Sequence, residues 1–293
     1  MNEIFKNSII VAAHPDDEIL WFSSILNKVD QIAICFLDIK SKPEVSIGRK
    51  KSVDSYPKKN VSFLNIDEAE VFNQASWTFP LTTEYGIKIN NKIAEGKYIQ
   101  NYYKLKENFE EVLNAKFNVF THNPWGEYGH EEHIQVYRAV KDLQEKYRYN
   151  IWFDNYCSNK SYNIMINCVR DNEFMYYSTK TNKELASYIK KIYVENGCWT
   201  WSHNFQWFED ESFISEDISD GELERYGKVF PINIIKDRRF IEQLDRKKNK
   251  SIYVNLLSSI KIANIATISS GRSSSKYPLK IISVNKIVLH SLI

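Results

Sequence analysis

Two short segments hold the residues that could do chemistry. They are His14-Pro15-Asp16-Asp17-Glu18 and Tyr128-Gly129-His130-Glu131-Glu132-His133. Imidazole and carboxylate groups are zinc ligands, and a carboxylate can also act as a general base. Each segment alone is weak evidence, because an acidic helix start and a His-x-x-His pair are both common in proteins without a metal. Together they are strong evidence for one shared site that could bind a metal.

Both segments follow a predicted strand and lead into a predicted helix. The apolar run 8–13 precedes a helical pattern at 19–26. The run 117–120 precedes a turn rich in Pro and Gly and a helical pattern from about 130 to 140. Ligands bind at the carboxyl ends of parallel strands in open α/β sheets, so we expect the two segments to meet there. The two histidines of the second segment are three residues apart and therefore share a helical face.

The helix after the first strand also bears on the charge of its aspartates. Pro15 suits the first helical position, and acidic residues in the first turn complement the positive end of the helix dipole. We therefore expect Asp16 and Asp17 to stay ionised.

The two segments together resemble the signature pair of the PIG-L/LmbE family of zinc-dependent de-N-acetylases, whose members remove acetyl groups from N-acetylglucosamine-type sugars. The resemblance covers about the first 150 residues and does not extend clearly beyond about residue 205. It implies that His14, Asp17 and His133 are the zinc ligands and that Asp16 is the general base. Another divalent metal, such as Fe2+, is the alternative to zinc.

The resemblance implies three further roles. His130 would stabilise the tetrahedral intermediate as an imidazolium, Tyr128 would polarise the amide carbonyl, and Glu132 would orient a histidine. Three protein ligands leave a fourth position for a water whose pKa zinc lowers to about 7. Adjacent aspartates cannot both face a metal with equal geometry, so one ligand and one base is the expected division. Many relatives carry Arg followed closely by Glu after the second strand, whereas Arg49 is followed here by Lys50.

The rest of the chain predicts a Rossmann-like α/β fold, a parallel sheet flanked by helices, with a C-terminal extension. A strand, helix and strand in succession indicate parallel pairing through a right-handed crossover. There is no G-x-G-x-x-G motif, which argues against a dinucleotide site. We expect a catalytic domain at 1–205 and an extension at 206–293 packed on it. The further predicted strands are 31–38, 61–66 and 149–153, and the further predicted helices are 46–56, 104–116 and 183–193.

The composition is that of a globular protein. Of 293 residues, 43% are apolar and 14% aromatic, which is ample for a buried core. The four cysteines include no C-x-x-C pair, so we expect free thiols and a cytoplasmic location. No signal peptide opens the chain, and no apolar run approaches the roughly 20 residues that span a bilayer.

Four other features are weaker candidates for function. The irregular segment 67–103 is rich in aromatic residues, which could stack on a sugar but more simply pack its own small core. In the loop 197–203, His203 could help to close a sugar pocket. His122 lies at a predicted strand tip, where it makes either a hydrogen bond behind the site or a simple packing contact. His290 is expected to be structural.

Positive charge is concentrated at the C-terminus. From residue 236 onward there are twelve Lys and Arg against three Asp and Glu, a net charge of +9, which leaves −7 for the first 235 residues because the total is +2. No nucleic-acid motif accompanies this charge. The basic segment is therefore either a solvated surface or an attraction for an anionic substrate group.

These observations predict a hydrolase that removes an acetyl group from an N-acetylated amino sugar or from its nucleotide or lipid conjugate. Metal-activated water would be the nucleophile, with Asp16 as its base. The expected partner is a small molecule or glycoconjugate that carries an N-acetyl sugar, and no nucleic acid; the oligomeric state stays open. One alternative is an amidase acting on another amino-sugar conjugate, such as a thiol-glycoside. The other is a non-catalytic sugar-binding protein with the same fold.

Overall fold

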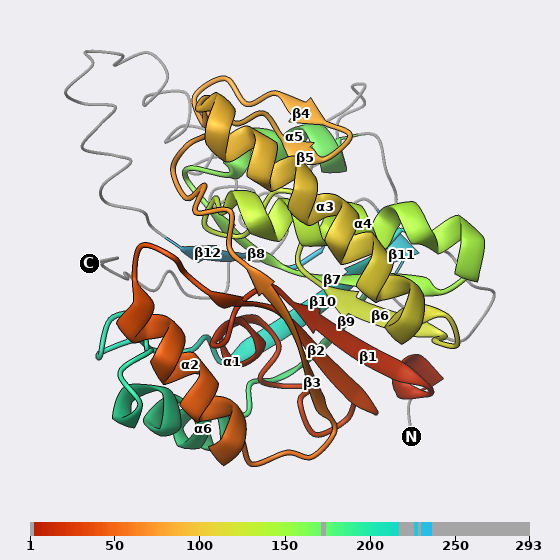
Figure 1. Cartoon of the computed structure of the whole chain (residues 1–293). Coiled ribbons are helices and arrows are strands. Elements are labelled where there is room, and N and C mark those ends of the chain that lie inside the picture. The colour runs from red at the N-terminus through yellow and green to blue at the C-terminus, as the bar shows by residue number, and fades with distance from the viewer. Residues whose placement is uncertain (1–2, 171–173, 217–225, 228–229, 236–293) are drawn as a thin grey trace.

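The structure is a computed structural model that describes residues 3–170, 174–216, 226–227 and 230–235 (Figure 1). The strands are β1 (Ser8–Ala12), β2 (Gln31–Asp38), β3 (Val61–Asp67), β4 (Thr82–Thr83), β5 (Gly86–Ile87), β6 (Asn118–Thr121), β7 (Asn150–Asp154), β8 (Tyr156–Ser158), β9 (Phe174–Lys180), β10 (Asp210–Ser215), β11 (Tyr226–Gly227) and β12 (Asn233–Ile235). The helices are the short 3-10 helix η1 (Glu3–Phe5), α1 (Asp17–Trp21), α2 (Pro43–Ser55), α3 (Lys92–Leu113), α4 (Glu131–Tyr147), α5 (Tyr162–Val169) and α6 (Lys183–Glu195).

The main sheet has eight strands in the order β11-β9-β10-β7-β6-β1-β2-β3. All pairs from β3 to β7 are parallel, and the pairs that involve β10 or β9 are antiparallel. The predicted α/β class with a parallel core sheet is therefore confirmed. The chain proceeds from β1 outward through β2 and β3, then returns to the other side of β1 with β6. The gap between the tips of β1 and β6 is thus a topological switch point, where ligands bind in this architecture.

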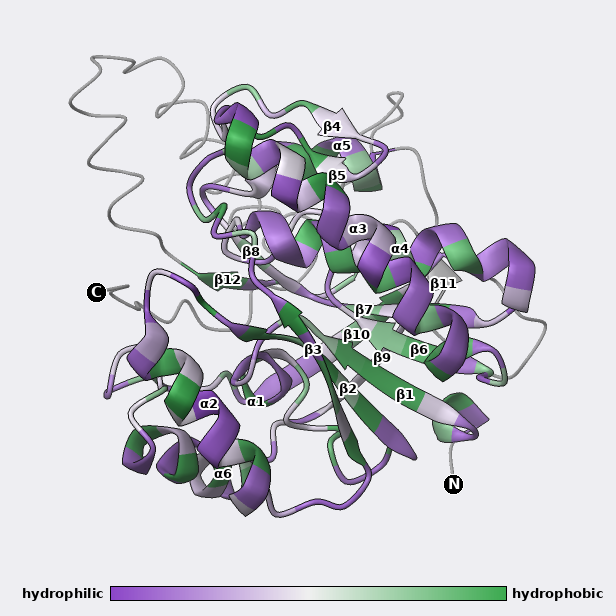
Figure 2. Cartoon of the chain, viewed as in Figure 1, coloured by the Kyte–Doolittle hydropathy of each residue, from purple (hydrophilic) through white to green (hydrophobic). Residues whose placement is uncertain are grey.

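Helices cover both faces of the sheet (Figure 1). Side chains of β1 alternate between the two sides. Ile9 and Val11 join one apolar core with α3 and α4, whereas Ile10 and Ala12 join a second core with α1 and α6. The strands are accordingly the most hydrophobic part of the fold (Figure 2). Because both faces of β1 are fully buried, its polar carboxyl end must be satisfied within the protein.

Two predicted helices differ from the observed ones. The helix expected at 19–26 ends at Trp21, because the backbone N–H of Ser24 donates to Glu211 Oε2 (2.9 Å) and the Ser23 hydroxyl donates to Glu211 Oε1 (2.7 Å). The helix expected at 104–116 begins earlier, at Lys92, where the Asn91 side chain caps it by accepting two backbone N–H bonds.

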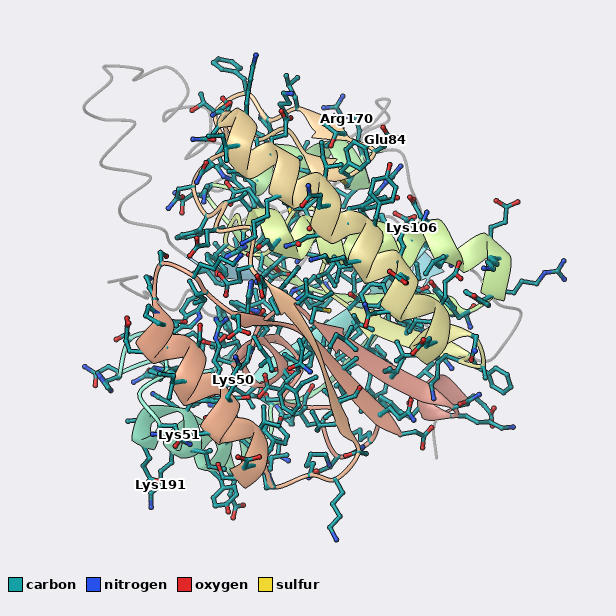
Figure 3. All side chains as sticks on the ribbon, in the orientation of Figure 1. Lys50, Lys51, Glu84, Lys106, Arg170 and Lys191 are labelled. Atoms are coloured by element: carbon teal, nitrogen blue, oxygen red, sulfur yellow. The ribbon has the colours of Figure 1, made fainter. Side chains whose placement is uncertain are left out.

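The sheet continues beyond residue 205, where we had expected the catalytic domain to end. β10 lies between β7 and β9. The basic segment from residue 236, with His290, lies outside the described residues. Among the described residues no helix is both long and apolar enough to cross a membrane. All four cysteines are free, as expected. The charged side chains of Lys51 and Lys191 point away from the sheet (Figure 3), whereas Lys50 pairs with Asp38 at the end of β2, at 2.7 Å.

The core around β6 gives a stability prediction. Phe120 is fully buried and packs against Phe5, Trp152 and Phe213 at ring-centroid distances of 5.6, 6.1 and 5.4 Å. Phe120→Ala should lower the free energy of unfolding by about 3–5 kcal/mol. Phe117→Ala, just before the same strand, removes a ring that is 56% exposed and should change it by about 0.5 kcal/mol or less. Urea unfolding of both variants measures this, and equal losses would contradict the assigned core.

Candidate metal centre and active site

The site lies at the switch point between β1 and β6. His14 to Asp17 follow β1, and the segment from His122 to His133 follows β6. Glu68 follows β3 at the same edge of the sheet. Three strand tips thus bring together residues far apart in the sequence, such as His14 and Glu132, which are 118 positions apart and in contact.

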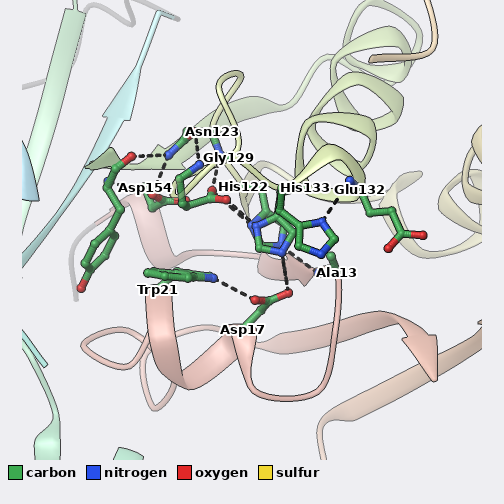
Figure 4. A network of polar contacts seen from close by, with 12 residues as sticks. Ala13, Asp17, Trp21, His122, Asn123, Gly129, Glu132, His133 and Asp154 are labelled. Atoms are coloured by element: carbon green, nitrogen blue, oxygen red, sulfur yellow. Dashed lines mark hydrogen bonds and ion pairs between the residues drawn. The ribbon is translucent and has the colours of Figure 1, made fainter. Parts of the chain in front are cut away.

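Asp17 is the centre of this cluster. Its Oδ2 lies 3.0 Å from His14 Nδ1 and 3.2 Å from His133 Nε2, while its Oδ1 accepts a hydrogen bond from Trp21 Nε1 at 2.9 Å. Figure 4 shows the carboxylate between Trp21 and the histidine rings. Asp17 is 1% exposed, so water cannot solvate its charge.

Both histidines are oriented by a second carboxylate. His14 Nε2 lies 3.1 Å from Glu132 Oε2, and His133 Nδ1 lies 2.5 Å from Glu127 Oε2. A carboxylate behind an imidazole holds the ring proton and turns the other nitrogen's lone pair forward. In both rings the forward nitrogen faces Asp17 Oδ2. His133 Nε2 is buried and makes no hydrogen bond of normal geometry.

Two contacts in this arrangement have the spacing of neighbouring ligands on one metal ion. Bonds of roughly 2.0–2.1 Å in a tetrahedral zinc site set neighbouring ligand atoms roughly 3.3 Å apart. The two distances to Asp17 Oδ2, 3.0 and 3.2 Å, match that spacing. The donor set of two imidazoles and one carboxylate is also typical of catalytic zinc.

The pKa shifts of His133, His14 and Asp17 also favour positive charge at this position. Burial alone would lower the pKa of His133, but Asp17 and Glu127 outweigh it and raise the pKa to about 9. Burial likewise opposes a charged His14, yet Glu68, Asp17 and Glu132 raise its pKa well above 6.5. Burial raises the pKa of Asp17, but His133 and His14 bring it well below the usual value. A cation in this position is therefore favoured, whether protons or a metal supply the charge.

Two other histidines are close but are engaged elsewhere. Ring nitrogens of His14, His130 and His133 lie within 4.8 Å of one another, and Asp17, His122 and His133 form a similar group. His122 Nε2 accepts the backbone N–H of Ala13 at 2.8 Å, so its lone pair is used, and its Nδ1 contacts Glu127. Of the two readings of His122, the structure favours the hydrogen bond behind the site.

The expected imidazolium at His130 stays a prediction, and the contacts of the ring bear on its charge. Its Nδ1 accepts the backbone N–H of Glu132 at 3.2 Å, which caps α4 and assigns the ring proton to Nε2. Burial, His133 and His14 lower its pKa well below 6.5. These contacts favour a neutral ring that donates through Nε2–H, because a second cation beside His133 and His14 is repelled.

Asp16 lies beside the cluster without joining it. Its Oδ2 accepts a hydrogen bond from the Thr200 hydroxyl at 2.9 Å. Burial and the neighbouring Asp17 raise its pKa well above 3.8, so only Asp17 keeps the low pKa that we expected for both. The backbone of Asp16 is left-handed, with φ 111°.

An open cleft of about 290 Å³ gives access to these groups. Tyr128 lines it. Burial and the two aspartates raise the pKa of Tyr128 well above 10, so it remains a donor. Arg49 also lines the cleft, where its Nη1 pairs with Glu68 Oε1 at 2.5 Å. The remaining lining residues are His14, Asp16, Asp17, Ile39, Lys42, Glu68, Phe72, His130, Thr200 and Trp201.

The loop 197–203 reaches the site through residues that sequence reasoning did not single out. Thr200 and Trp201 line the cleft, whereas His203 is exposed and does not. In the segment 67–103, Trp77 and Tyr98 are buried in the core, while Phe72 lines the cleft.

Glu127 is a residue of the site that the sequence analysis did not predict. It contacts both His122 and His133 and its pKa is depressed: burial would raise it, but the two imidazoles outweigh that effect. The only signal in the sequence is an acidic residue inside the turn from Gly126 to Gly129, in the same strand-to-helix connection that leads to the predicted ligand His133.

Comparison with known proteins finds only distant likeness. No family model matches the chain, and no curated protein matches it. A deacetylase complex from the teicoplanin biosynthesis pathway has a TM-score of 0.44 and 9% identity, covering 73% of this chain and 99% of that one. The zinc-inhibited form of teicoplanin deacetylase Orf2 has a TM-score of 0.43 and 10% identity, with coverage of 73% and 99%. The A40926 pseudoaglycone deacetylase Dbv21 has a TM-score of 0.43 and 8% identity, with coverage of 72% and 97%. Likeness at this level is too distant to assign a substrate to this chain.

Substitutions can test which of these residues bind a metal and which only lie beside it. His133→Ala should weaken zinc binding severely, because it removes one of the three predicted protein ligands. His130→Asn should keep it, and Asn preserves the helix cap. Glu127→Gln should weaken binding by roughly 10- to 100-fold. Elemental analysis and competition with a chelator measure these effects. Loss of zinc from His130→Asn and its retention in His133→Ala would reverse the assignment.

Proposed function

We propose that this chain is a metal-dependent N-deacetylase that removes an acetyl group from an N-acetylated amino sugar or from its nucleotide or lipid conjugate. The observation that carries the proposal is the convergence of His14 and His133 on Asp17 Oδ2, at 3.0 and 3.2 Å, beside the separate carboxyl group of Asp16. One group can thus hold a metal while the other moves protons.

His14, Asp17 and His133 would hold the ion, which is zinc by donor type, with Fe2+ as an alternative. When bound, such an ion supplies a water of lowered pKa and polarises an amide carbonyl. Glu132 and Glu127 act from behind by fixing the tautomers of the two histidines.

Asp16 takes a proton from the attacking water and returns it to the nitrogen of the departing amine. Burial and the neighbouring Asp17 raise the pKa of Asp16, which is the direction that makes a carboxylate a stronger base. The Thr200 hydroxyl fixes the orientation of the carboxyl group. Water thus adds to the acyl carbon, the C–N bond breaks, and acetate and the free amine leave.

The developing oxyanion needs donors on the opposite side of the cleft. Tyr128 offers its hydroxyl and His130 offers Nε2–H, and both residues line the cleft. Donors that are already in place stabilise the transition state without reorganisation.

The two alternatives differ in what they require of the site. An amidase acting on a thiol-glycoside or another conjugate would use the same residues, because the metal and base act on the amide and not on the sugar. A non-catalytic sugar-binding protein would have no use for a buried carboxyl group of raised pKa beside the metal ligands, since that burial costs stability. Asp16 therefore favours an enzyme.

The two aspartates should fail in different ways. Asp16→Asn should keep zinc and lose turnover by about 10²- to 10⁴-fold. Asp17→Asn should lose zinc affinity. Acetate release from a panel of N-acetyl sugars, nucleotide sugars, glycolipids and thiol-glycosides measures turnover and identifies the substrate class. An Asp16→Asn enzyme with full activity would remove the base from the mechanism, and no release from any substrate would favour the binding protein.

A further inference from the structure

Lys160 is a buried cation close to the site that the proposed reaction does not use. It lies in the turn between β8 and α5 and is 3% exposed. Its Nζ donates to the carbonyl oxygen of Gly129 at 2.5 Å and to Asn73 Oδ1 at 2.7 Å. Burial of an ammonium group is costly, so such contacts must compensate for its lost hydration.

The first contact fixes the main chain that leads into His130. Gly129 has φ 90°, and a Cβ atom there would lie 2.7 Å from Lys160 Cδ. The lysine stem therefore fills the space that only a glycine leaves open. Its ammonium group holds the carbonyl oxygen immediately before His130.

The second contact fixes the ring that covers His130. Asn73 follows Phe72, whose ring stacks on His130 with centroids 4.9 Å apart and planes at 20°. The Lys160 ammonium group also lies 4.8 Å from the centroid of Phe72 and 4.5 Å from that of Trp77. Cation–π contacts of this length stabilise the rings in place.

The other face of His130 is also covered. His133 stacks on it with centroids 4.5 Å apart and planes at 16°. Of these two stacking partners, His133 is buried and held by Glu127. Phe72 lines the cleft, and its side chain is 37% exposed. If the Phe72 ring could move, the His130 ring stacked on it could therefore also change its orientation.

We propose that Lys160 is a positioning residue of the deacetylase site, which holds the Gly129 carbonyl and the Phe72 loop together so that His130 keeps one orientation toward the substrate. The inference rests on the proposed function for its kinetic consequence, but not for its effect on the ring. In this proposal Lys160, which lies outside both sequence motifs, aligns the hydrogen-bond donor of His130. A misplacement of about 1 Å at such a donor can lower the reaction rate by roughly 10²-fold.

The test variant is Lys160→Met, which keeps the stem and removes the ammonium group. We expect kcat to fall by roughly 10- to 100-fold, with zinc content and KM unchanged. In a His130→Asn background the same change should lower kcat by less than about threefold, because the two residues act as one unit. Full additivity of the two losses would overturn the proposal.

The matched control is Lys28→Met. Lys28 also donates to one side-chain oxygen, of Thr179 at 2.8 Å, and also lies over two rings, of Phe5 and Tyr177. It is remote from the cleft lining and should leave kcat unchanged. If Lys160→Met does not fold, Asn73→Gly replaces it. Glycine keeps the left-handed backbone at that position (φ 64°) and removes only the amide, so kcat should still fall, by roughly threefold or more.

A readout without catalysis separates this inference from the proposed function. Side-chain 15N NMR of the protein as purified should show His130 as one Nε2–H tautomer, and its signal should become averaged or broadened in Lys160→Met but not in Lys28→Met. An unchanged His130 signal would overturn the inference, even in an active enzyme. A changed signal in a protein that cleaves no substrate would support the positioning role and refute the deacetylase.

Discussion

The approach of two imidazole nitrogens to one buried oxygen, Asp17 Oδ2, is the constraint on which the rest of the site depends. An isolated carboxylate at this depth would be protonated, so the arrangement persists only if positive charge faces it. Either protons on His14 and His133 or a metal ion held between these residues can supply that charge. The pairing of β1 with β6 is what brings them together, since each strand ends where its histidine-bearing segment begins.

Carboxylates around the centre connect it to the outer helices. Glu131 and Glu132 are adjacent on α4, yet Glu131 accepts hydrogen bonds from the loop around Ala75, and Glu132 accepts one from Ala69 N. Glu18 accepts the backbone N–H of Asp16, and its other oxygen accepts hydrogen bonds from hydroxyl groups on α6 and just after α2. Burial raises the pKa of Glu18 to about 7, so it is held by neutral partners and not by an ion pair. Helices that contribute no reacting group therefore help to hold the site in place.

The parallel sheet and the residues of the two motifs could be predicted from the sequence, because each depends on a pattern of residues close together in the chain. A strand end and the helix after it lie within a few residues, so His14, Asp17 and His133 could be placed at one edge from order alone. Sequence reasoning could not predict partners supplied from elsewhere, such as Thr200 or Lys160, because their residue types are ordinary in a surface loop. The early end of α1 had the same cause: the terminating acceptor, Glu211, is 187 residues from the backbone group it binds.

The backbone at the site is the last feature that local propensity does not explain. Asp16 (φ 111°) and Glu127 (φ 45°) both adopt the left-handed region, which costs a residue with a side chain roughly 1–3 kcal/mol. Each is compensated by a contact that depends on this turn: Asp16 N–H donates to Glu18 Oε2, and Glu127 accepts from the backbone N–H of Asn123 at 3.0 Å. Glycine would remove the strain at either position, but it would also remove the carboxylate. The proposed function gives a reason for both strained turns, because it uses a carboxylate at positions where the backbone conformation alone would favour glycine.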